Sequence, residues 1–182
     1  MFLSIVAGAV VLLLLGVGVA WYRMYRGTRI LICPETQMPV GASVKAFTAA
    51  RTNYGGNPRI VIASCSRWPE RAGCDQACAP QVAASPDETL VKTIVTRWYQ
   101  RHLCASCGGA IADIGGSVRP GLRGVDGTIR EWSQIAPENL PEMLASSLPL
   151  CARCDLAEDF RQRFPELVVD REETPLRNRL IH

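Results

Sequence analysis

An uncharged stretch near the start of the chain limits its fold more than any other sequence feature. Residues 2–22 read FLSIVAGAVVLLLLGVGVAWY and contain no Asp, Glu, Lys or Arg. About 20 apolar residues, at roughly 1.5 Å each, match the ~30 Å hydrocarbon layer of a bilayer. The stretch therefore predicts a single transmembrane helix over residues 2–22, followed by a small domain on one side of the membrane.

The residues after this stretch predict its orientation. Aromatic side chains typical of a membrane–water interface follow at positions 21, 22 and 25, and arginines at positions 23, 26 and 29. No basic side chain precedes the apolar run. By the positive-inside rule, the sequence predicts a single-pass protein of the cell membrane, with the N-terminus outside and the C-terminal domain in the cytoplasm.

A cleaved signal peptide is the alternative interpretation of the same stretch. Gly18, Val19 and Ala20 are small residues where a signal peptidase would cut. However, the stretch lacks a basic n-region, and its apolar run is longer than the usual ~7 to 15 residues. These differences favour a membrane anchor.

Charge is distributed unevenly after the anchor. Residues 23–71 carry eight Lys or Arg against two Glu, a net charge of +6, whereas residues 72–182 carry twelve against fifteen acidic residues, a net charge of −3. An anionic leaflet attracts such a basic segment by about 1 kcal/mol per residue near the surface. A solvated basic face is the alternative. Nucleic acid is not expected as a partner, because no aromatic-interleaved recognition motif accompanies the basic residues.

Four of the eight cysteines form two closely spaced pairs. Cys104-x2-Cys107 and Cys151-x2-Cys154 are separated by 43 residues. Two sulfurs three positions apart in a tight turn can face one ion, and a second pair completes a tetrahedron of thiolates. Glycines at positions 108 and 109 provide the backbone freedom that such a turn needs. We call these four cysteines the CxxC site.

Over residues 104–154 this pattern resembles the zinc-ribbon and rubredoxin-like knuckles. The resemblance implies a structural zinc ion, with iron as the alternative because four thiolates also hold iron or an iron–sulfur cluster. The second pair differs from the first, since Asp155 and a helical apolar pattern follow Cys154. We therefore expect Cys151 and Cys154 at a helix N-terminus, where thiolate pKa values fall.

The other four cysteines are more widely spaced and predict a second metal site. They are Cys33, Cys65, Cys74 and Cys78. Cys33 and Cys65 each follow an apolar strand pattern, and the other two lie within one short loop. Eight cysteines divide into two four-thiolate sites, so two zinc ions are expected. Alternatively, these four are free cysteines that pack as small hydrophobic residues.

Disulfides are the competing use of an even number of cysteines. Topology separates the two uses, because cytoplasmic thiols stay reduced and external thiols oxidise. A c-type haem is excluded, since no histidine follows either CxxC pair.

For the fold, the sequence predicts a single N-terminal transmembrane helix followed by a small α+β, zinc-ribbon-like domain with short strands and two to three helices. Twelve prolines and fifteen glycines divide the chain into short elements. We expect a cysteine-containing β-rich subdomain over 23–84, a helix with the CxxC site over 85–169, and a mobile tail over 170–182.

Three local signals refine this expectation. Residues 85–88, Ser-Pro-Asp-Glu, form a capping box that predicts a helix running to about Arg101. Asp126-Gly127 predicts a β-turn. Residues 137–144 predict a short helix.

Catalytic motifs are absent from the sequence. It has no nucleophile elbow, phosphate-binding glycine loop, HExxH helix or dinucleotide fingerprint. Four thiolates also leave zinc no open position for water. The sequence thus indicates a non-enzymatic, membrane-anchored zinc protein that acts as a scaffold, subunit or interaction module. We expect the bilayer and another membrane or membrane-associated protein as partners, and no small-molecule substrate. The alternatives are a rubredoxin-like or iron–sulfur electron carrier at a membrane redox complex, and a thiol-based metal or redox sensor.

Overall fold

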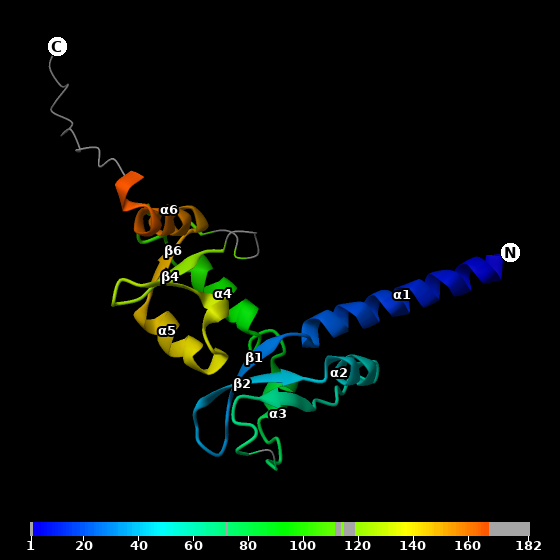
Figure 1. Ribbon diagram of the computed structural model, residues 1–182. Helices are drawn as coiled ribbons and strands as arrows, with labels where there is room; N and C mark the ends of the chain where they lie inside the picture. Colours follow the sequence, from blue (N-terminus) through cyan, green and yellow to red (C-terminus); the bar gives the residue numbers. More distant parts are fainter. Residues whose placement is uncertain (1, 72, 112–113, 115–118, 168–182) are drawn as a thin grey trace.

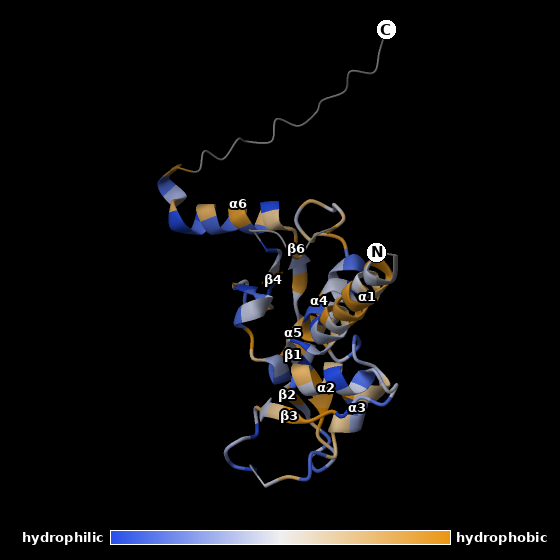
Figure 2. Ribbon diagram, turned by 90° about the vertical axis from the view of Figure 1, so that its right-hand side faces the viewer, coloured by the Kyte–Doolittle hydropathy of each residue, from blue (hydrophilic) through white to orange (hydrophobic). Residues whose placement is uncertain are grey.

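A computed structural model describes residues 2–71, 73–111, 114 and 119–167 (Figure 1). Helix α1 (Phe2–Tyr25) projects from a body of short helices and two three-stranded antiparallel sheets. Its segment Ser4–Tyr25 is long and apolar enough to cross a membrane, and none of its most apolar window is buried in the body. Figure 2 shows the hydrophobic colouring along this helix. The expected apolar helix is thus present as one candidate span.

The first sheet contains β1 (Thr28–Ile32), β2 (Pro39–Val44) and β3 (Ile62–Cys65), in the order β1-β2-β3. Alternate residues of β1 are buried, as expected for a strand with one face on a core. Helices α2 (Ala46–Asn53) and α3 (Ala79–Ala84) pack with this sheet, and together they form the first half of the body. The core that they share contains Tyr25, Leu31, Val40, Ala42, Val44, Ala49, Ile62, Cys78 and Val82.

The number of helices differs from the expectation. The described part of the chain has five α-helices after α1, not two or three, and two of them lie in the segment expected to be β-rich. Helix α2 buries only Ala49 and Ala50, and α3 is six residues long with proline in its first turn. Such short helices with small buried side chains leave almost no apolar periodicity in a sequence, so tertiary packing decides their formation.

Arg29 is fully buried at the junction between the two halves. Its guanidinium donates to the carbonyl oxygens of Met24 (2.6 Å) and Pro86 and to Oγ1 of Thr89 (2.8 Å). The Ile30 amide also donates to the Thr89 carbonyl, at 2.8 Å. Burial lowers the pKa of Arg29 from its ordinary value. Arg29 is therefore a structural cation, and it does not contribute surface charge beside the apolar helix.

The same contacts correct the expected start of the next helix. Helix α4 (Val91–Gln100) begins six residues after Ser85, so the capping box does not start it. Residues 86–89 instead form turns whose polar groups bond to β1. The local capping signal is weaker than the need of a buried guanidinium for hydrogen-bond acceptors.

The second sheet has the order β5-β4-β6 and packs against α4. Its strands are β4 (Gly121–Arg123), β5 (Ile129–Glu131) and β6 (Leu148–Leu150). The hydroxyl of Tyr99 in α4 donates to the carbonyl oxygens of Pro120 and Gly121, each at 3.0 Å. Leu122, Leu140 and Leu150 are fully buried in this core. The hydrogen bonds and the core contacts fix α4 beside the strands that lead to the CxxC site.

Two other local predictions are confirmed in this half. The turn between β4 and β5 contains Asp126-Gly127, and Gly127 has φ +77°. The short helix is present as a 3-10 turn, Pro137–Asn139, that continues into α5 (Leu140–Ser146). A second 3-10 turn, Trp132–Gln134, follows β5. Helix α6 (Ala152–Arg163) and a last 3-10 turn, Pro165–Leu167, follow β6. The expected tail over 170–182 lies outside the described residues.

Candidate metal centres

The CxxC site lies where the turn after α4 meets the start of α6. Cys104 and Cys107 belong to the turn, Cys151 immediately precedes α6 and Cys154 lies in its first helical turn. All four Sγ atoms lie within 4.8 Å of one another. The Cys107 and Cys151 sulfurs are 3.8 Å apart, which is about the edge of a tetrahedron with metal–sulfur bonds of ~2.3 Å. The two pairs that are 43 residues apart in sequence thus come together in a geometry that can hold a metal ion.

Backbone hydrogen bonds shape the first turn. The Cys104 amide donates to the Gly109 carbonyl at 2.9 Å, and the Gly108 amide donates back to the Cys104 carbonyl at 2.8 Å. Gly108 has φ +68°, in the left-handed region that glycine adopts without strain. The glycine that the sequence places after the second cysteine is therefore required by the backbone of the turn.

Amide groups also stabilise the thiolate of Cys104. Burial alone raises the pKa of this thiol, but hydrogen bonds from the backbone amides of Cys151, Cys107 and Ser106 lower it to about 6. The Cys151 amide lies 3.3 Å from the Cys104 sulfur. At neutral pH one sulfur of the site therefore favours the charged form that a metal ion requires.

The second pair behaves differently from the expectation. Cys151 and Cys154 do lie at the N-terminus of α6, as predicted. However, the pKa of Cys154 is raised to about 12, chiefly by its interaction with the Cys151 side chain. The lowered pKa belongs to Cys104, because amides of its own turn and of Cys151 point at that sulfur. A divalent ion would displace the proton from Cys154, so metal binding is coupled to proton release.

Helix α6 packs on the body with little apolar burial. None of the residues of α6 is fully buried. Asp155, in the first turn of α6, faces β4, since a Cβ added to Gly121 would lie 2.4 Å from Asp155 Oδ1. The apolar side chains of Leu156, Phe160, Phe164 and Leu167 are exposed by 42–61%. Apolar burial therefore contributes little to holding α6 on the body.

The other four cysteines line one cavity of about 450 Å³. Cys33 follows β1, Cys65 ends β3, Cys74 lies in the next loop and Cys78 immediately precedes α3. The structure thus brings them around one cavity, and the second metal site stays a prediction. They are less tightly grouped than the CxxC site, which in the described part of the chain is the one group with three or more metal-ligating side chains within 4.8 Å.

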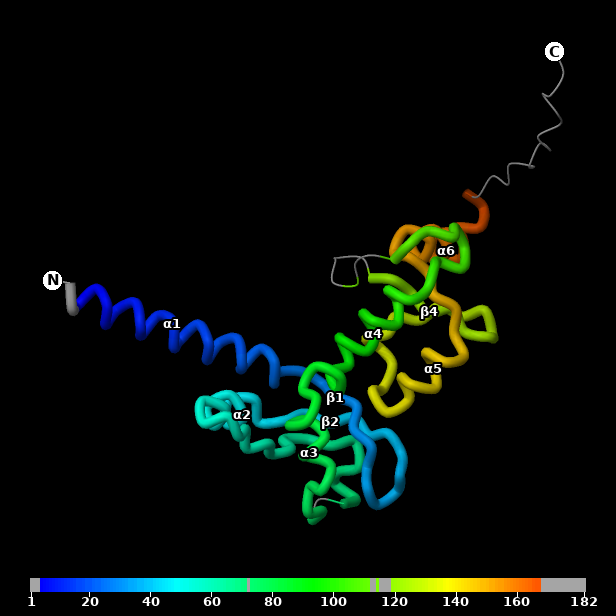
Figure 3. Tube along the Cα trace, turned by 180° about the vertical axis from the view of Figure 1, so that it is seen from behind, coloured from blue at the N-terminus to red at the C-terminus, as the bar shows by residue number. Residues whose placement is uncertain are grey.

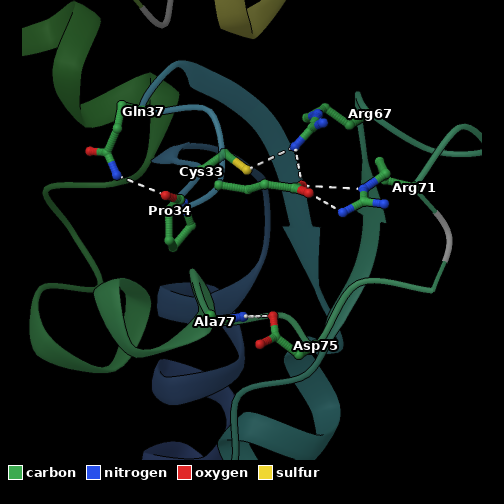
Figure 4. Close-up of polar contacts among 8 residues, drawn as sticks. Cys33, Pro34, Gln37, Arg67, Arg71, Asp75 and Ala77 are labelled. Atoms are coloured by element: carbon green, nitrogen blue, oxygen red, sulfur yellow. Dashed lines mark hydrogen bonds and ion pairs between the residues drawn. The ribbon is translucent and has the colours of Figure 1, made fainter.

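Charged side chains that the sequence analysis did not identify also line this cavity (Figure 4). Arg67 Nη1 donates to the Cys33 sulfur at 3.1 Å and to Glu35 Oε2 at 2.9 Å, and Arg71 pairs with the same carboxylate. The pKa of Cys33 is lowered to about 7, first by the backbone amide of Thr36 and to a smaller extent by Arg67. The position of Arg67, two residues after Cys65, was the only sequence signal for this contact.

Burial raises the pKa of Cys78, and negative charge on Cys65, Cys74 and Cys33 raises it further. The four thiols are therefore close enough to interact electrostatically. A cation among them would favour all four thiolates at once.

Fold and site together define a small α+β protein with one candidate membrane span and a four-cysteine group that can bind a metal ion. Comparisons with protein families, with curated proteins and with solved structures find no match to this chain.

Proposed function

We propose that this chain is a membrane-anchored protein whose cytoplasmic domain is held together by structural zinc, and that it acts as a non-enzymatic scaffold or subunit. The observation that carries the proposal is the meeting of Cys104, Cys107, Cys151 and Cys154 within 4.8 Å. Four thiolates saturate a tetrahedral zinc ion and leave no position for a substrate or water, which is typical of structural sites.

The position of the CxxC site supports a structural role. One pair follows α4, which carries the core of the second half, and the other pair starts α6, which buries none of its residues fully. An ion at this point joins two segments that apolar packing does not join. Zinc would then contribute directly to folding free energy, as in other small metal-stabilised domains.

The second zinc ion of the proposal lies in the cavity lined by Cys33, Cys65, Cys74 and Cys78. Four thiolates around Zn²⁺ carry a net charge of −2, and the Arg67 guanidinium is in place to offset part of it. Because Arg71 contacts Glu35 but no sulfur among its hydrogen bonds, Arg71→Gln is a matched control for Arg67→Gln. We expect Arg67→Gln to raise the pKa of Cys33 and weaken zinc at this site, with Arg71→Gln affecting it less.

Anchoring by α1 and a cytoplasmic domain are the other part of the proposal. Arg23 and Arg26 are exposed at the end of the apolar helix, where the positive-inside rule counts them. A cytoplasmic placement would keep the eight cysteines reduced and able to bind metal. The exposed apolar side chains of Leu156 and Phe160 in α6, and of Phe164 and Leu167 just after it, support another membrane-associated protein as partner, because large exposed apolar patches mark interaction surfaces.

Elemental analysis of the full chain tests the metal. The protein is extracted in detergent and purified under reducing conditions without added metal, and its absorption spectrum is recorded. About two zinc ions per chain and no visible colour are expected. Iron with visible absorption would replace the scaffold with an electron carrier, and disulfides without metal would overturn the cytoplasmic topology.

A further inference from the structure

Helix α2 lies alongside the second half of α1 (Figures 1 and 3). The Tyr54 hydroxyl, just after α2, donates to the Leu14 carbonyl of α1 at 2.6 Å. The Tyr54 ring meets the Trp21 ring edge-on, with centroids 4.6 Å apart. A Cβ at Gly18 would lie 2.6 Å from the Tyr54 oxygen, so the glycine permits this approach. The two helices are therefore packed against each other over about two turns of α1.

This packing places α2 at the depth of the bilayer if α1 crosses it. Leu14 precedes Tyr22 by eight residues, or about 12 Å along a helix. If the membrane–water interface lies at Tyr22, the Tyr54 hydroxyl lies about 12 Å inside the hydrocarbon layer. With the interface at Leu14, the thirteen residues of α1 up to that point span only ~20 Å of a ~30 Å hydrocarbon layer. Only the placement with the interface at Tyr22 lets α1 span the layer, and it brings Tyr54 and the end of α2 into contact with lipid.

A surface groove of about 590 Å³ lies between α1 and α2. Its apolar walls include Leu15, Val19 and Phe47, whose side chains are exposed by 61%, 50% and 72%. Exposing this much contiguous apolar surface to water is unfavourable, whereas a lipid acyl chain would cover it. The groove is continuous with the apolar surface of α1, so its natural occupant is a lipid.

Arg51 is the one charged residue among the described residues that line this groove, and it is exposed. A long arginine side chain can keep its stem along apolar surface while its guanidinium reaches the headgroup layer. Guanidinium groups bind phosphate oxygens in a bidentate manner. The groove therefore combines apolar walls with a single phosphate-binding group.

We propose that the groove between α1 and α2 binds one anionic phospholipid, with its acyl chain against Leu15, Val19 and Phe47 and its phosphate at Arg51. The proposal rests on the membrane anchoring proposed above. It makes α2 a second membrane-contacting element, so the domain is held against the bilayer at two elements.

Native mass spectrometry of the full chain in non-ionic detergent tests the site with phosphatidylglycerol and phosphatidylcholine as probes. The wild type should retain phosphatidylglycerol preferentially, and Arg51→Gln should weaken that retention about fivefold. Arg59→Gln is the matched control, since Arg59 is exposed nearby and does not line the groove. Phe47→Ser should weaken retention of both lipids.

Equal retention by Arg51→Gln and the wild type, or equal loss in Arg59→Gln, would overturn the lipid site. A partner's transmembrane helix in the groove would give the first of these results. Alkaline extraction of membranes separates this failure from failure of the anchor. If the wild type stays in the membrane pellet but Arg51→Gln retains phosphatidylglycerol as well as the wild type does, only the lipid site is wrong. Release of the wild type would overturn the anchor and the lipid site together.

Discussion

The two cysteine groups differ in how many segments of the chain must be positioned to form them. The CxxC site needs two segments, because each contributes two sulfurs three residues apart, and its sulfurs lie within 4.8 Å. The other group needs the ends of β1 and β3, a loop and the residue before α3. Its cysteines surround a cavity of about 450 Å³ instead of meeting at a point. Close spacing in sequence thus produces the tighter site.

The two groups also differ in what would remain without metal. The first half has its own core, with Leu31 and Val82 buried between the sheet and α3. Helix α6 has no fully buried residue, so we expect it to need the metal at the CxxC site more. Metal should therefore matter more for folding at the CxxC site than in the cavity.

Cys104→Ser should have the largest effect. It removes a buried ligand, and apparent zinc binding supplies roughly 10 to 16 kcal/mol of folding free energy in small zinc-finger peptides. We expect zinc to fall by one ion per chain, with loss of α6 helicity and of cooperative unfolding in the second half. Circular dichroism and zinc analysis measure both. Ala105→Ser, which adds a serine to the same turn without removing a sulfur, should leave both unchanged. Full zinc content in Cys104→Ser would exclude the CxxC site as the metal centre.

Cys33→Ser should have a smaller effect on stability while also removing one zinc ion. The core around Leu31 remains, so thermal unfolding should stay cooperative at a lower temperature. Combined with Cys104→Ser, it should abolish zinc binding. If Cys33→Ser retains two zinc ions, the four cavity cysteines are free thiols and the comparison between two metal sites no longer holds.

Features that depend on residues close together in the chain could be predicted from the sequence. The apolar helix, the CxxC pairs and the Asp126-Gly127 turn each depend on residues a few positions apart, so the sequence determines their geometry directly. Gly108 was predicted for the same reason, since the turn needs its positive φ.

Features that depend on distant segments could not be predicted. Arg29 was interpreted as a surface charge beside the membrane, yet it is buried against residues more than fifty positions away. That contact also displaced the start of α4. Helix α2 was missed because its buried side chains are alanines, and the approach of Tyr54 to Leu14 spans 40 positions. Sequence patterns carry no signal for such pairs.

Gly108→Ala should destabilise the protein moderately. No atom lies within 4 Å of an added Cβ, so the effect comes from the φ of +68° alone, about 1 to 2 kcal/mol in free energy of unfolding. It should also weaken zinc affinity, because the turn holds Cys104 and Cys107. Gly127→Ala is the matched control, with φ +77°, open space and no cysteine nearby in its hairpin. It should cost similar stability without changing zinc affinity. Equal zinc affinities in the two variants would mean that the turn does not pre-form the site.

The smallest expected effect is the pH dependence of stability, which should have opposite signs for Asp155 next to the CxxC site and for Asp126 in the β4–β5 hairpin. Burial raises the pKa of Asp155, with Asp159 and Glu131 adding to the shift. A carboxyl whose folded pKa is raised stabilises the protein when protonated, and this stability is lost as the pH rises through the folded pKa. Asp155→Asn should therefore raise the melting temperature more at pH 7 than at pH 4.

Asp126→Asn should show the opposite sign. Hydrogen bonds from the Thr128 hydroxyl and amide, at 2.7 and 3.0 Å, lower the pKa of Asp126. Its stabilising contribution is present above the unfolded pKa and is lost as the pH falls through the folded pKa. The variant should thus melt lower than the wild type at pH 7, with a smaller difference at low pH. Scanning calorimetry of both variants against the wild type at each pH cancels any change in zinc occupancy that they share. Destabilisation by Asp155→Asn at pH 7 would show that its charge assists the start of α6 more than its burial opposes it.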